Sequence, residues 1–430
     1  MSQSPVLVRQ LELTAGSTHV AVPQRLGGLQ YRSLQLLVRL HRQPLGMIST
    51  GLPSGGLDSA QLSAMIWEHF GDDIAEHMRA DGMPRPSGLP LDGRFATRLA
   101  PCRHEARRES GGLADVSVVV PTCNRTRTLI PCLQTILASS TPPREVIVVE
   151  NRPASSQTAA ALEAAFPGEA RIRYLEEPKP GTSRARNRGL ANARGAIVAF
   201  VDDDVLVDRH WLAHLALAFV EQPLASCVTG LILPLELETP AQLWLEQYGG
   251  FAKGYRRVVF DHTRRTVDPL FPYTAGRFGS GANMALRTRV ARDIGGFDVA
   301  LGGGTSASGG EDLDVFLRLM LRGHTLVYEP SALLWHRHHT SVPELRYQLL
   351  HYGRGLGALL AKQLAGTQRR DFLGRVPVGL RYLLDPASPK NARRQNDYPR
   401  QLALLELVGL LTGPSAYFVS RRASRALTAR

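Results

Sequence analysis

Three consecutive carboxylates after a short apolar run constrain this chain most. The run covers residues 196–201, and Asp202, Asp203 and Asp204 follow it directly. A short run rich in β-branched and aromatic residues predicts a buried strand. Three carboxylates at its end repel one another unless a cation lies between them, and Asp oxygens suit Mg²⁺ or Mn²⁺. The pattern therefore indicates a divalent cation site, with an acidic turn that caps the next helix as the structural alternative.

Length and charge narrow the class of protein. A chain of 430 residues exceeds one ordinary domain, and 43% hydrophobic residues are enough for a large core. The formal net charge of +13 attracts polyanions, but no helix-turn-helix, zinc-finger or RNA-binding signature accompanies it. We therefore expect phosphate-bearing substrates and an anionic membrane surface as partners, and no nucleic acid.

The N-terminal residues and the cysteines favour a cytoplasmic location. No basic region followed by an apolar core opens the sequence, and no stretch approaches about 20 uninterrupted apolar residues. The four cysteines form no CxxC pair and no Cys/His spacing of a zinc site. We expect reduced thiols, no disulfides and a cytoplasmic chain, either free or peripheral on the inner face of the membrane.

Two parts of different pattern make up most of the chain. Residues 1–112 are predicted to form an accessory α+β domain and linker, with two strands and a helix at 59–78 that Asp58 caps. Residues 113–340 alternate short strands with helices, which predicts an α/β domain with a mostly parallel sheet.

A third part, residues 341–430, is basic and mostly helical. It holds fifteen Lys and Arg against five Asp and Glu. Residues 402–419 are strongly apolar, interrupted by Glu406 and by the pair Gly413 and Pro414, and several arginines follow. An apolar helix with a basic end fits a membrane interface, and a helix packed on the core is the equal alternative.

Small polar loops are expected where the first two strands of the α/β domain end. The first strand ends in a loop that carries Pro121, Thr122, Asn124 and Arg125. The second strand ends in Glu150. Such residues at the carboxyl edge of a parallel sheet can receive the base and ribose of a nucleotide.

An arginine-bearing helix follows Gly181 and carries Arg184, Arg186 and Asn187. The N-terminus of a helix and nearby arginines favour an anion such as a diphosphate. Arginines at helical spacing more often form a solvated face, but the short separation from the Asp triplet favours the binding role.

A glycine-rich run over residues 302–310 leads to Glu311 and Asp312 at the start of another helix. Acids are favoured there by the helix dipole, and a carboxylate at the end of a closing loop can equally act as a general base. His336 follows the last expected strand. It can complete the coordination of a cation, with a purely structural histidine as the alternative.

Together these segments resemble the inverting family 2 glycosyltransferases of GT-A fold. The resemblance covers about half of the chain and implies a Rossmann-like, mixed and mostly parallel sheet. It rests on segments that occur in the family's order: 118–125, 185–189, 202–204, 279–283, 295–298, 311–314 and 335–336.

The resemblance also implies partners and roles. The donor is a nucleotide-sugar, the cofactor is divalent Mn or Mg, and the acceptor is a saccharide, a lipid-linked molecule or a small molecule. Asp312 is then the base and Glu311 helps to place the acceptor, while Asp204 and His336 hold the metal. The implied donor-binding residues are Pro121, Thr122, Asn124, Arg125, Glu150, Arg184, Arg186, Asn187, Asp202 and Asp203.

Departures from the family pattern bear on the alternatives. Glu150 stands where many relatives carry Asp, and no Gln-x-x-Arg-Trp motif follows the catalytic acids, which argues against a processive polysaccharide synthase. A sugar-nucleotide nucleotidyltransferase needs a Gly- and Lys-containing loop where residues 121–124 are Pro-Thr-Cys-Asn. A catalytically silent scaffold that binds a partner or carrier lipid has no need of Asp204, Asp312 and His336 together.

Overall fold

The structure is a computed structural model of the chain. The structure describes residues 4–15, 31–53, 55–89, 102, 115–261, 268–367, 369–385, 388 and 398–428.

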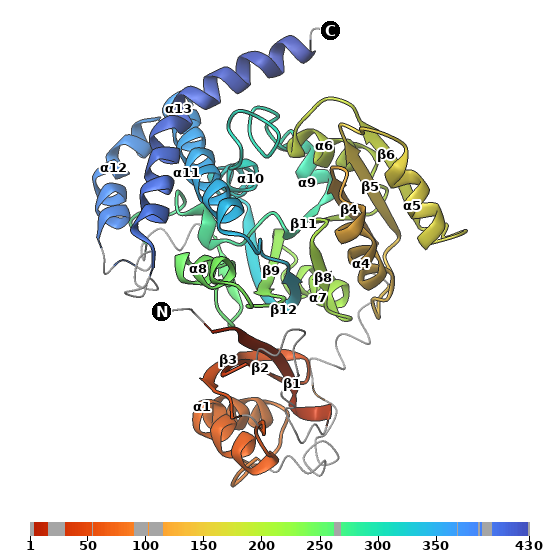
Figure 1. Ribbon diagram of the computed structural model, residues 1–430, viewed down its shortest axis with the longest axis vertical. Coiled ribbons are helices and arrows are strands. Elements are labelled where there is room, and N and C mark those ends of the chain that lie inside the picture. Colours follow the sequence, from red (N-terminus) through yellow and green to blue (C-terminus); the bar gives the residue numbers. More distant parts are fainter. Residues whose placement is uncertain are drawn as a thin grey trace.

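A nine-stranded mixed sheet forms the centre of the molecule (Figure 1). Its strand order is β10-β12-β9-β11-β7-β4-β5-β6, and β8 pairs with β12. The four strands β7, β4, β5 and β6 are parallel, whereas β11 runs antiparallel to both β7 and β9. The strands are β4 (Val116–Thr122), β5 (Glu145–Asn151), β6 (Ile172–Glu177), β7 (Ile197–Val201), β8 (Val205–Val207), β9 (Ala225–Pro234), β10 (Val258–Phe260), β11 (Asn283–Arg287) and β12 (Thr325–His336).

Helices cover both faces of this sheet because its strands are apolar on both sides. Along β4, Val118 and Val120 pack on one face and Val119 packs on the other, as the two-residue period of a strand requires. One face receives α4 (Thr126–Leu137) and α7 (Trp211–Glu221). The other face receives α6 (Thr182–Asn192), α9 (Thr288–Asp293) and α10 (Glu311–Leu321). The further helices α5 (Gln157–Ala165) and α8 (Pro240–Tyr248) lie in the connections after β5 and β9.

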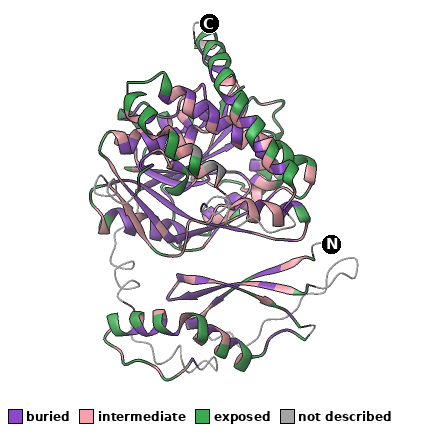
Figure 2. Cartoon of the chain, turned by 90° about the vertical axis from the view of Figure 1, so that its left-hand side faces the viewer, coloured by how far each residue is buried: buried purple, intermediate pink, exposed green. Residues whose placement is uncertain are grey.

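A smaller α+β unit precedes this sheet. Its three strands are β1 (Val6–Glu12), β2 (Ser33–Leu40) and β3 (Gln43–Gly51), and α1 (Ser59–Ala80) packs on them. Asp58 and Gln61 form the expected capping box at the start of α1. The unit lies below the larger sheet in Figure 2, and its buried residues come from both the strands and α1.

Contacts between the small unit and the large sheet are both apolar and ionic. Leu37 of β2 is fully buried among apolar side chains of β9 and β12. Arg39, also on β2, lies 2.7 Å from the carboxylate of Asp208, and both side chains are nearly buried. A β-bridge joins Val6 to Leu237. The small unit therefore shares buried surface with the large sheet along β2.

The C-terminal region is helical, as the sequence predicted, with α11 (Val342–Leu364), α12 (Arg369–Leu384) and α13 (Arg400–Thr428). Gly413 and Pro414 interrupt the apolar run but not the helix, because α13 runs through both residues. Proline removes a single backbone donor from a helix. Close packing against α11 on the glycine side of this turn supports the helix there.

Glycines let α11 and α13 approach to backbone contact. A Cβ added at Gly353 would lie 2.0 Å from the carbonyl oxygen of Glu406, and one at Gly409 would lie 2.1 Å from that of Leu350. Gly357 and Gly413 extend the same seam by one turn, which gives a Gly-x-x-x-Gly spacing on each helix. Any larger residue at these positions would force the two helices apart.

The outer face of α13 remains apolar. Leu404, Leu411 and Phe418 are 60%, 72% and 53% exposed at helical spacing. Within the described residues, the segment Arg400–Leu427 is long and apolar enough to cross a membrane, although length and composition alone also fit a core helix. The segment is still not an uninterrupted apolar run, because Glu406 lies within it.

Candidate active site

The carboxyl ends of β4, β5 and β7 bring the predicted polar residues to one edge of the sheet. Thr122 ends β4, Glu150 lies next to the end of β5, and Asp202 follows β7. These strands are neighbours in the order β7-β4-β5. Their loops therefore open on the same edge, where open α/β sheets bind ligands.

Asp203 anchors the loop after β4. Its Oδ2 accepts a hydrogen bond from Oγ1 of Thr122 at 2.6 Å, and its Oδ1 accepts one from Nη1 of Arg125 at 3.1 Å. Burial, and then the charge of Asp204, raise the pKa of Asp203 to about 7. The middle member of the triplet thus holds two of the predicted donor-binding residues in place.

Asp204 faces His336 across the end of the sheet. Its Oδ1 lies 3.4 Å from Nε2 of His336 and has no hydrogen-bond partner among the residues that the structure describes. Burial, and then the charge of Asp202, raise the pKa of Asp204 to about 6. Burial lowers the pKa of His336 to about 3, so its imidazole is neutral near pH 7.

A hydrogen-bonded chain behind His336 fixes which of its nitrogens faces Asp204. The carboxylate of Glu246 only accepts, so Nε2 of His338 donates to it at 2.9 Å. Nδ1 of His338 then accepts from Nδ1 of His336 at 3.0 Å. The lone pair of His336 Nε2 is therefore directed at a carboxylate oxygen. Two acceptors face each other, an arrangement that fits a bound divalent cation.

Arg186 joins the Asp triplet to the start of α10. Its side chain is 3% exposed, and it donates to Oδ1 of Asp202 at 2.8 Å and to Oε1 of Glu311 at 2.7 Å. Burial raises the pKa of Glu311 above its ordinary value, and the guanidinium opposes that effect. Two acids from distant parts of the chain thus share one buried cation.

Backbone donors orient the carboxylate of Asp312. Its Oδ2 accepts from the amide of Gly281 at 2.7 Å, and its Oδ1 accepts from the amide of Leu313 at 2.8 Å. A Cβ at Gly281 would lie 2.9 Å from the Cβ of Asp312, so the glycine permits this approach. Gly310, at φ 82°, ends the glycine-rich run directly before Glu311 and turns the chain into α10.

One carboxylate oxygen of Glu150 accepts a hydrogen bond, and the other has no partner among the described residues. Its Oε1 accepts from the amide of Asn124 at 2.8 Å, while Oε2 is buried without a partner among the described residues. Asn124 adopts a left-handed conformation at φ 55°, which folds the loop after β4 over β5. Pro121 lies buried within β4.

Two predicted donor-binding residues point elsewhere in this structure. The side-chain amide of Asn187 makes two 2.8 Å hydrogen bonds with the backbone of Phe297, so it holds the loop before the glycine-rich run. Nη2 of Arg184 donates to the carbonyl of Ser424 on α13 at 3.4 Å. Neither residue is brought to the Asp triplet by any contact that the structure describes.

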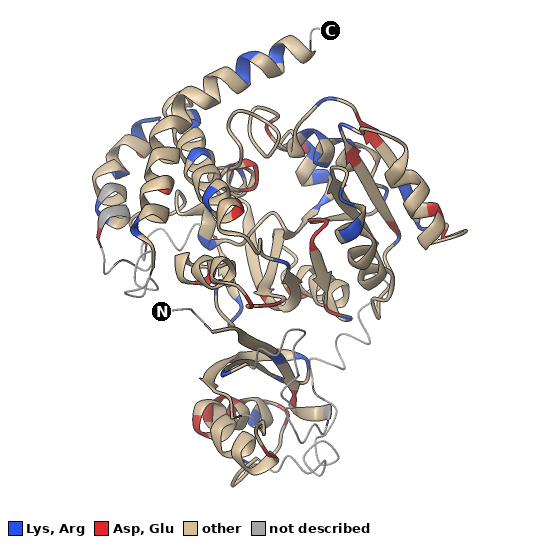
Figure 3. Cartoon of the chain, in the orientation of Figure 1, with Lys and Arg blue, Asp and Glu red and all other residues tan. Residues whose placement is uncertain are grey.

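The glycine-rich run packs on the start of α6. The amide of Thr182 donates to the carbonyl of Gly303 at 2.9 Å, and Oγ of Ser183 donates to the carbonyl of Leu301 at 2.8 Å. The N-terminus of α6 is therefore engaged by this run, where the sequence predicted a diphosphate. Figure 3 shows basic residues gathered along α6 and at the C-terminal end of α13.

Sequence reasoning missed Glu246 and His338. His338 belongs to a visible run of three histidines within residues 336–339, so that signal was present. Glu246 lies in the last turn of α8, and nothing in its sequence neighbourhood marks it. Its role depends on the fold bringing α8 beside the end of β12.

The class of protein follows from this arrangement and from a family match. Residues 117–295 match the model of glycosyl transferase family 2, which confirms the resemblance found in the sequence. The predicted fold class, a GT-A α/β domain with a small α+β unit before it and a helical region after it, is confirmed.

Known proteins resemble the chain over this part and beyond it. A pre-mycofactocin glycosyltransferase from Mycobacterium tuberculosis is 29% identical over 65% of this chain and 57% of its own length. The succinoglycan biosynthesis protein ExoM from Rhizobium meliloti is 28% identical over 56% of this chain and 74% of its own. The mannosyltransferase PcManGT from Pyrobaculum calidifontis, solved with GDP-Man and Mn²⁺, gives a TM-score of 0.45 at 17% identity, over 85% of this chain and 98% of that one.

Proposed function

We propose that the chain is an inverting glycosyltransferase that moves a sugar from a nucleoside diphosphate to an acceptor hydroxyl, with a divalent cation. The observation that carries this proposal is the buried bridge of Arg186 between Asp202 and Glu311. This bridge links the edge of the sheet where the donor would bind to the pair of acids at the start of α10, where the acceptor would bind. Asp204 and His336, which would hold the cation, face each other near Asp202.

Asp312 is the proposed general base. The two backbone amides that bind its oxygens orient the carboxylate, which can accept a proton. As the acceptor oxygen bonds to the anomeric carbon, its proton passes to Asp312 and the bond from that carbon to the diphosphate oxygen breaks. A single displacement from the opposite side inverts the anomeric configuration, with no covalent enzyme intermediate.

The reaction requires stabilisation of the negative charge on the leaving diphosphate. Asp204 and His336 would hold Mn²⁺ or Mg²⁺, which neutralises that charge when it is bound. Arg125, half exposed beside Asp203 and Asp204, lies close enough to contact the same phosphates. The free buried oxygen of Glu150 would accept from a hydroxyl or ring N–H group of the nucleoside.

A screen of sugar donors and acceptors tests the proposed function. Purified protein is incubated with UDP-, GDP- and dTDP-sugars, with and without Mn²⁺, and release of nucleoside diphosphate is measured. Pre-mycofactocin belongs among the acceptors because a relative of that name aligns with 65% of this chain. Saccharide and lipid-linked acceptors complete the set. Release that requires both Mn²⁺ and an acceptor supports the proposal.

A catalytically silent scaffold is the second candidate. It predicts donor or lipid binding without any release of nucleoside diphosphate under every donor and acceptor combination. Calorimetry on the same samples separates the two candidates, because binding without turnover favours the scaffold, and turnover excludes it.

We also propose that the chain works in the cytoplasm with α13 against an anionic membrane. The exposed apolar stripe of Leu404, Leu411 and Phe418 continues into the exposed Arg421 and Arg422. In flotation with vesicles that contain anionic lipid, the full chain should float, and a variant with Leu411→Gln and Phe418→Gln should float less. A full chain that stays at the bottom of the gradient would end the membrane proposal.

A further inference from the structure

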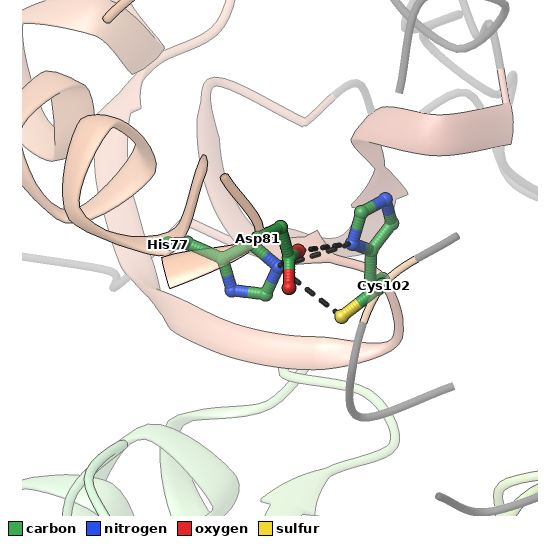
Figure 4. Close-up of side chains that lie close together, drawn as sticks. His77, Asp81 and Cys102 are labelled. Carbon is green, nitrogen blue, oxygen red and sulfur yellow. Dashed lines mark hydrogen bonds and ion pairs between the residues drawn. The ribbon is translucent and has the colours of Figure 1, made fainter. Parts of the chain in front are cut away.

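A second group of metal-ligating side chains lies in the small α+β unit, away from the candidate active site. It consists of His41, His77, Asp81 and Cys102. One ligand atom from each of the four lies within 4.8 Å of the others. Figure 4 shows His77, Asp81 and Cys102 converging on one point.

Local structure explains why three of these side chains meet. His77 and Asp81 are four residues apart at the end of α1, so they lie on the same side of the helix. His41 is the first of two residues in the turn between β2 and β3, at φ 50°. That turn type favours Asn or Gly, so a histidine is held there at a conformational cost. The turn presents its ring to the end of α1.

The fourth side chain comes from a distant part of the sequence. Cys102 is fully buried, and its Sγ lies 3.4 Å from Nε2 of His77. It is the only residue described between 90 and 114, and its thiol is not in a disulfide. The fold therefore carries this thiol back to the end of α1 before the large sheet begins.

The distances converge on a single nitrogen. Nε2 of His77 lies 3.0 Å from Nδ1 of His41, 3.3 Å from Oδ2 of Asp81 and 3.4 Å from Sγ of Cys102. One imidazole nitrogen carries either one N–H or one lone pair. It cannot satisfy three close polar atoms by hydrogen bonding. In a Cys-His-Asp catalytic arrangement, by contrast, the carboxylate and the thiol contact opposite nitrogens of the ring.

We propose that these four side chains form a structural zinc site. Zinc bonds of about 2.0–2.3 Å in tetrahedral geometry place neighbouring ligand atoms about 3.3–3.8 Å apart. The distances given above, together with 3.9 Å between Nδ1 of His41 and Oδ2 of Asp81, fall close to that range. Thiolate and imidazole ligands select zinc over Mg²⁺ or Mn²⁺, which prefer oxygen.

The closed ligand set argues for a structural role. All four residues are protein ligands, so no position remains for a substrate or catalytic water. His41 and Cys102 are at most 4% exposed. The site ties together the β2–β3 turn, the end of α1 and the chain that leads to the large sheet. Zinc binding contributes folding energy directly in small units of this kind.

Metal analysis of the purified full chain tests the proposal. We expect about one tightly held zinc per chain after desalting. The same content is expected for Asp204→Asn, which removes a proposed ligand of the catalytic cation. Cys102→Ser and His77→Gln should each lose most of the zinc. His69→Gln is the matched control, because His69 is an exposed histidine on the same helix and should keep it.

Cobalt substitution keeps the proposal testable if the variants fail to fold. Full chain exchanged with Co²⁺ should show a thiolate-to-cobalt charge-transfer band and the strong visible bands of a tetrahedral site. A well-folded full chain that retains no transition metal after zinc supplementation, and shows no charge-transfer band with Co²⁺, would overturn the zinc site. That outcome would leave the proposed transferase activity untouched, since the two cation sites share no residue.

Discussion

Nη1 of Arg186 donates to Oε1 of Glu311 at 2.7 Å, which joins α6 to the start of α10 inside the candidate site. The other end of the same guanidinium bonds Asp202. Removal of this buried cation is destabilising, because Glu311 then stays buried without its partner. The bridge thus makes the geometry of the acceptor side depend on that of the donor side.

Asp312→Asn should abolish sugar transfer while leaving donor binding nearly intact. An amide cannot take the acceptor proton, and general base catalysis is worth about 100- to 10,000-fold in rate. We expect kcat to fall by that factor and the calorimetric Kd for the donor to stay within about twofold. Asp293→Asn, at an exposed acid of α9, is the control and should keep full turnover. Near-normal turnover in Asp312→Asn would remove this residue as the base.

His338→Gln should weaken cation binding by Asp204 and His336, although His338 is not itself a proposed ligand. The substitution breaks the chain from Glu246 that orients His336. Loss of such an outer partner typically costs about 10- to 100-fold in metal affinity. Turnover measured against Mn²⁺ concentration should show a half-saturation point raised by that factor, with kcat largely restored at high Mn²⁺. Loss of kcat without any shift in Mn²⁺ dependence would contradict this role.

Donor affinity should depend on the same cation. Calorimetric titration of the wild-type chain with a donor found in the screen is repeated after treatment with a chelator. We expect a sharp loss of affinity, because the diphosphate then faces Asp202 and Asp204 without a neutralising charge. Asp204→Asn should bind weakly with or without the chelator. A donor affinity that does not change when the chelator is added would show that Asp204 does not bind a metal needed for donor binding.

Sequence reasoning found residues whose local context carries the signal. Asp202 and Glu150 follow apolar strands, and Asp312 opens a helix after a glycine-rich run. Each position is fixed by the chain on either side of it, so a pattern of a few residues was enough. That Asp204 and His336 meet was implied by the family resemblance, and the strand pairing of β8 with β12 provides the contact.

The remaining features depend on contacts between segments far apart in the sequence. Glu246 reaches His338 only because the fold brings the end of α8 to the segment that follows β12. The zinc ligands were missed because Cys102 has no partner at a zinc-like spacing, and a hairpin turn supplies His41. Pro414 lies inside α13, where packing against α11 outweighs the helix-breaking preference of proline. Contacts of this kind can be identified only from the three-dimensional structure.

Gly353→Ala should destabilise the chain by about 1–3 kcal/mol, the usual cost of overpacking. The new methyl group would meet the backbone of α13, which cannot move aside as a flexible side chain can. Gly374→Ala is the matched control, since a Cβ there meets nothing within 4 Å in the middle of α12. It should be neutral or stabilising by about 0.5–1 kcal/mol. Urea unfolding measures both, and equal stability of the two variants would contradict the close packing.

Arg39→Met should destabilise the chain at pH 7 and much less at acid pH. Burial alone raises the pKa of Asp208, but the charge and hydrogen bond of Arg39 outweigh it and the pKa ends below its usual value. The ionised carboxylate therefore stabilises the folded state near neutrality, and this contribution is lost as pH falls through the lowered pKa. Removing one partner of a buried pair costs about 3–5 kcal/mol.

Two histidines beside Asp208 act in the same direction. Burial lowers the pKa of His210 to about 4 and that of His214 to about 3, and Arg39 contributes to both shifts. Their neutral forms are favoured in the folded state, so stability is lost as pH falls below about 6.5. Without Arg39 both histidines protonate more easily, and the acid sensitivity of the chain becomes smaller.

Urea unfolding at pH 7, 5 and 4 measures the difference in free energy of unfolding between the wild type and Arg39→Met. We expect this difference to narrow with falling pH, because Asp208 in Arg39→Met stays buried without Arg39 and becomes protonated at a higher pH than in the wild type. Arg85→Met is the control, since Arg85 pairs with Asp72 at an exposed surface. Exposed pairs contribute about 0–1 kcal/mol, so its gap should be small at every pH. A gap for Arg39→Met that stays constant from pH 7 to 4 would mean that Asp208 does not depend on Arg39 for its charge.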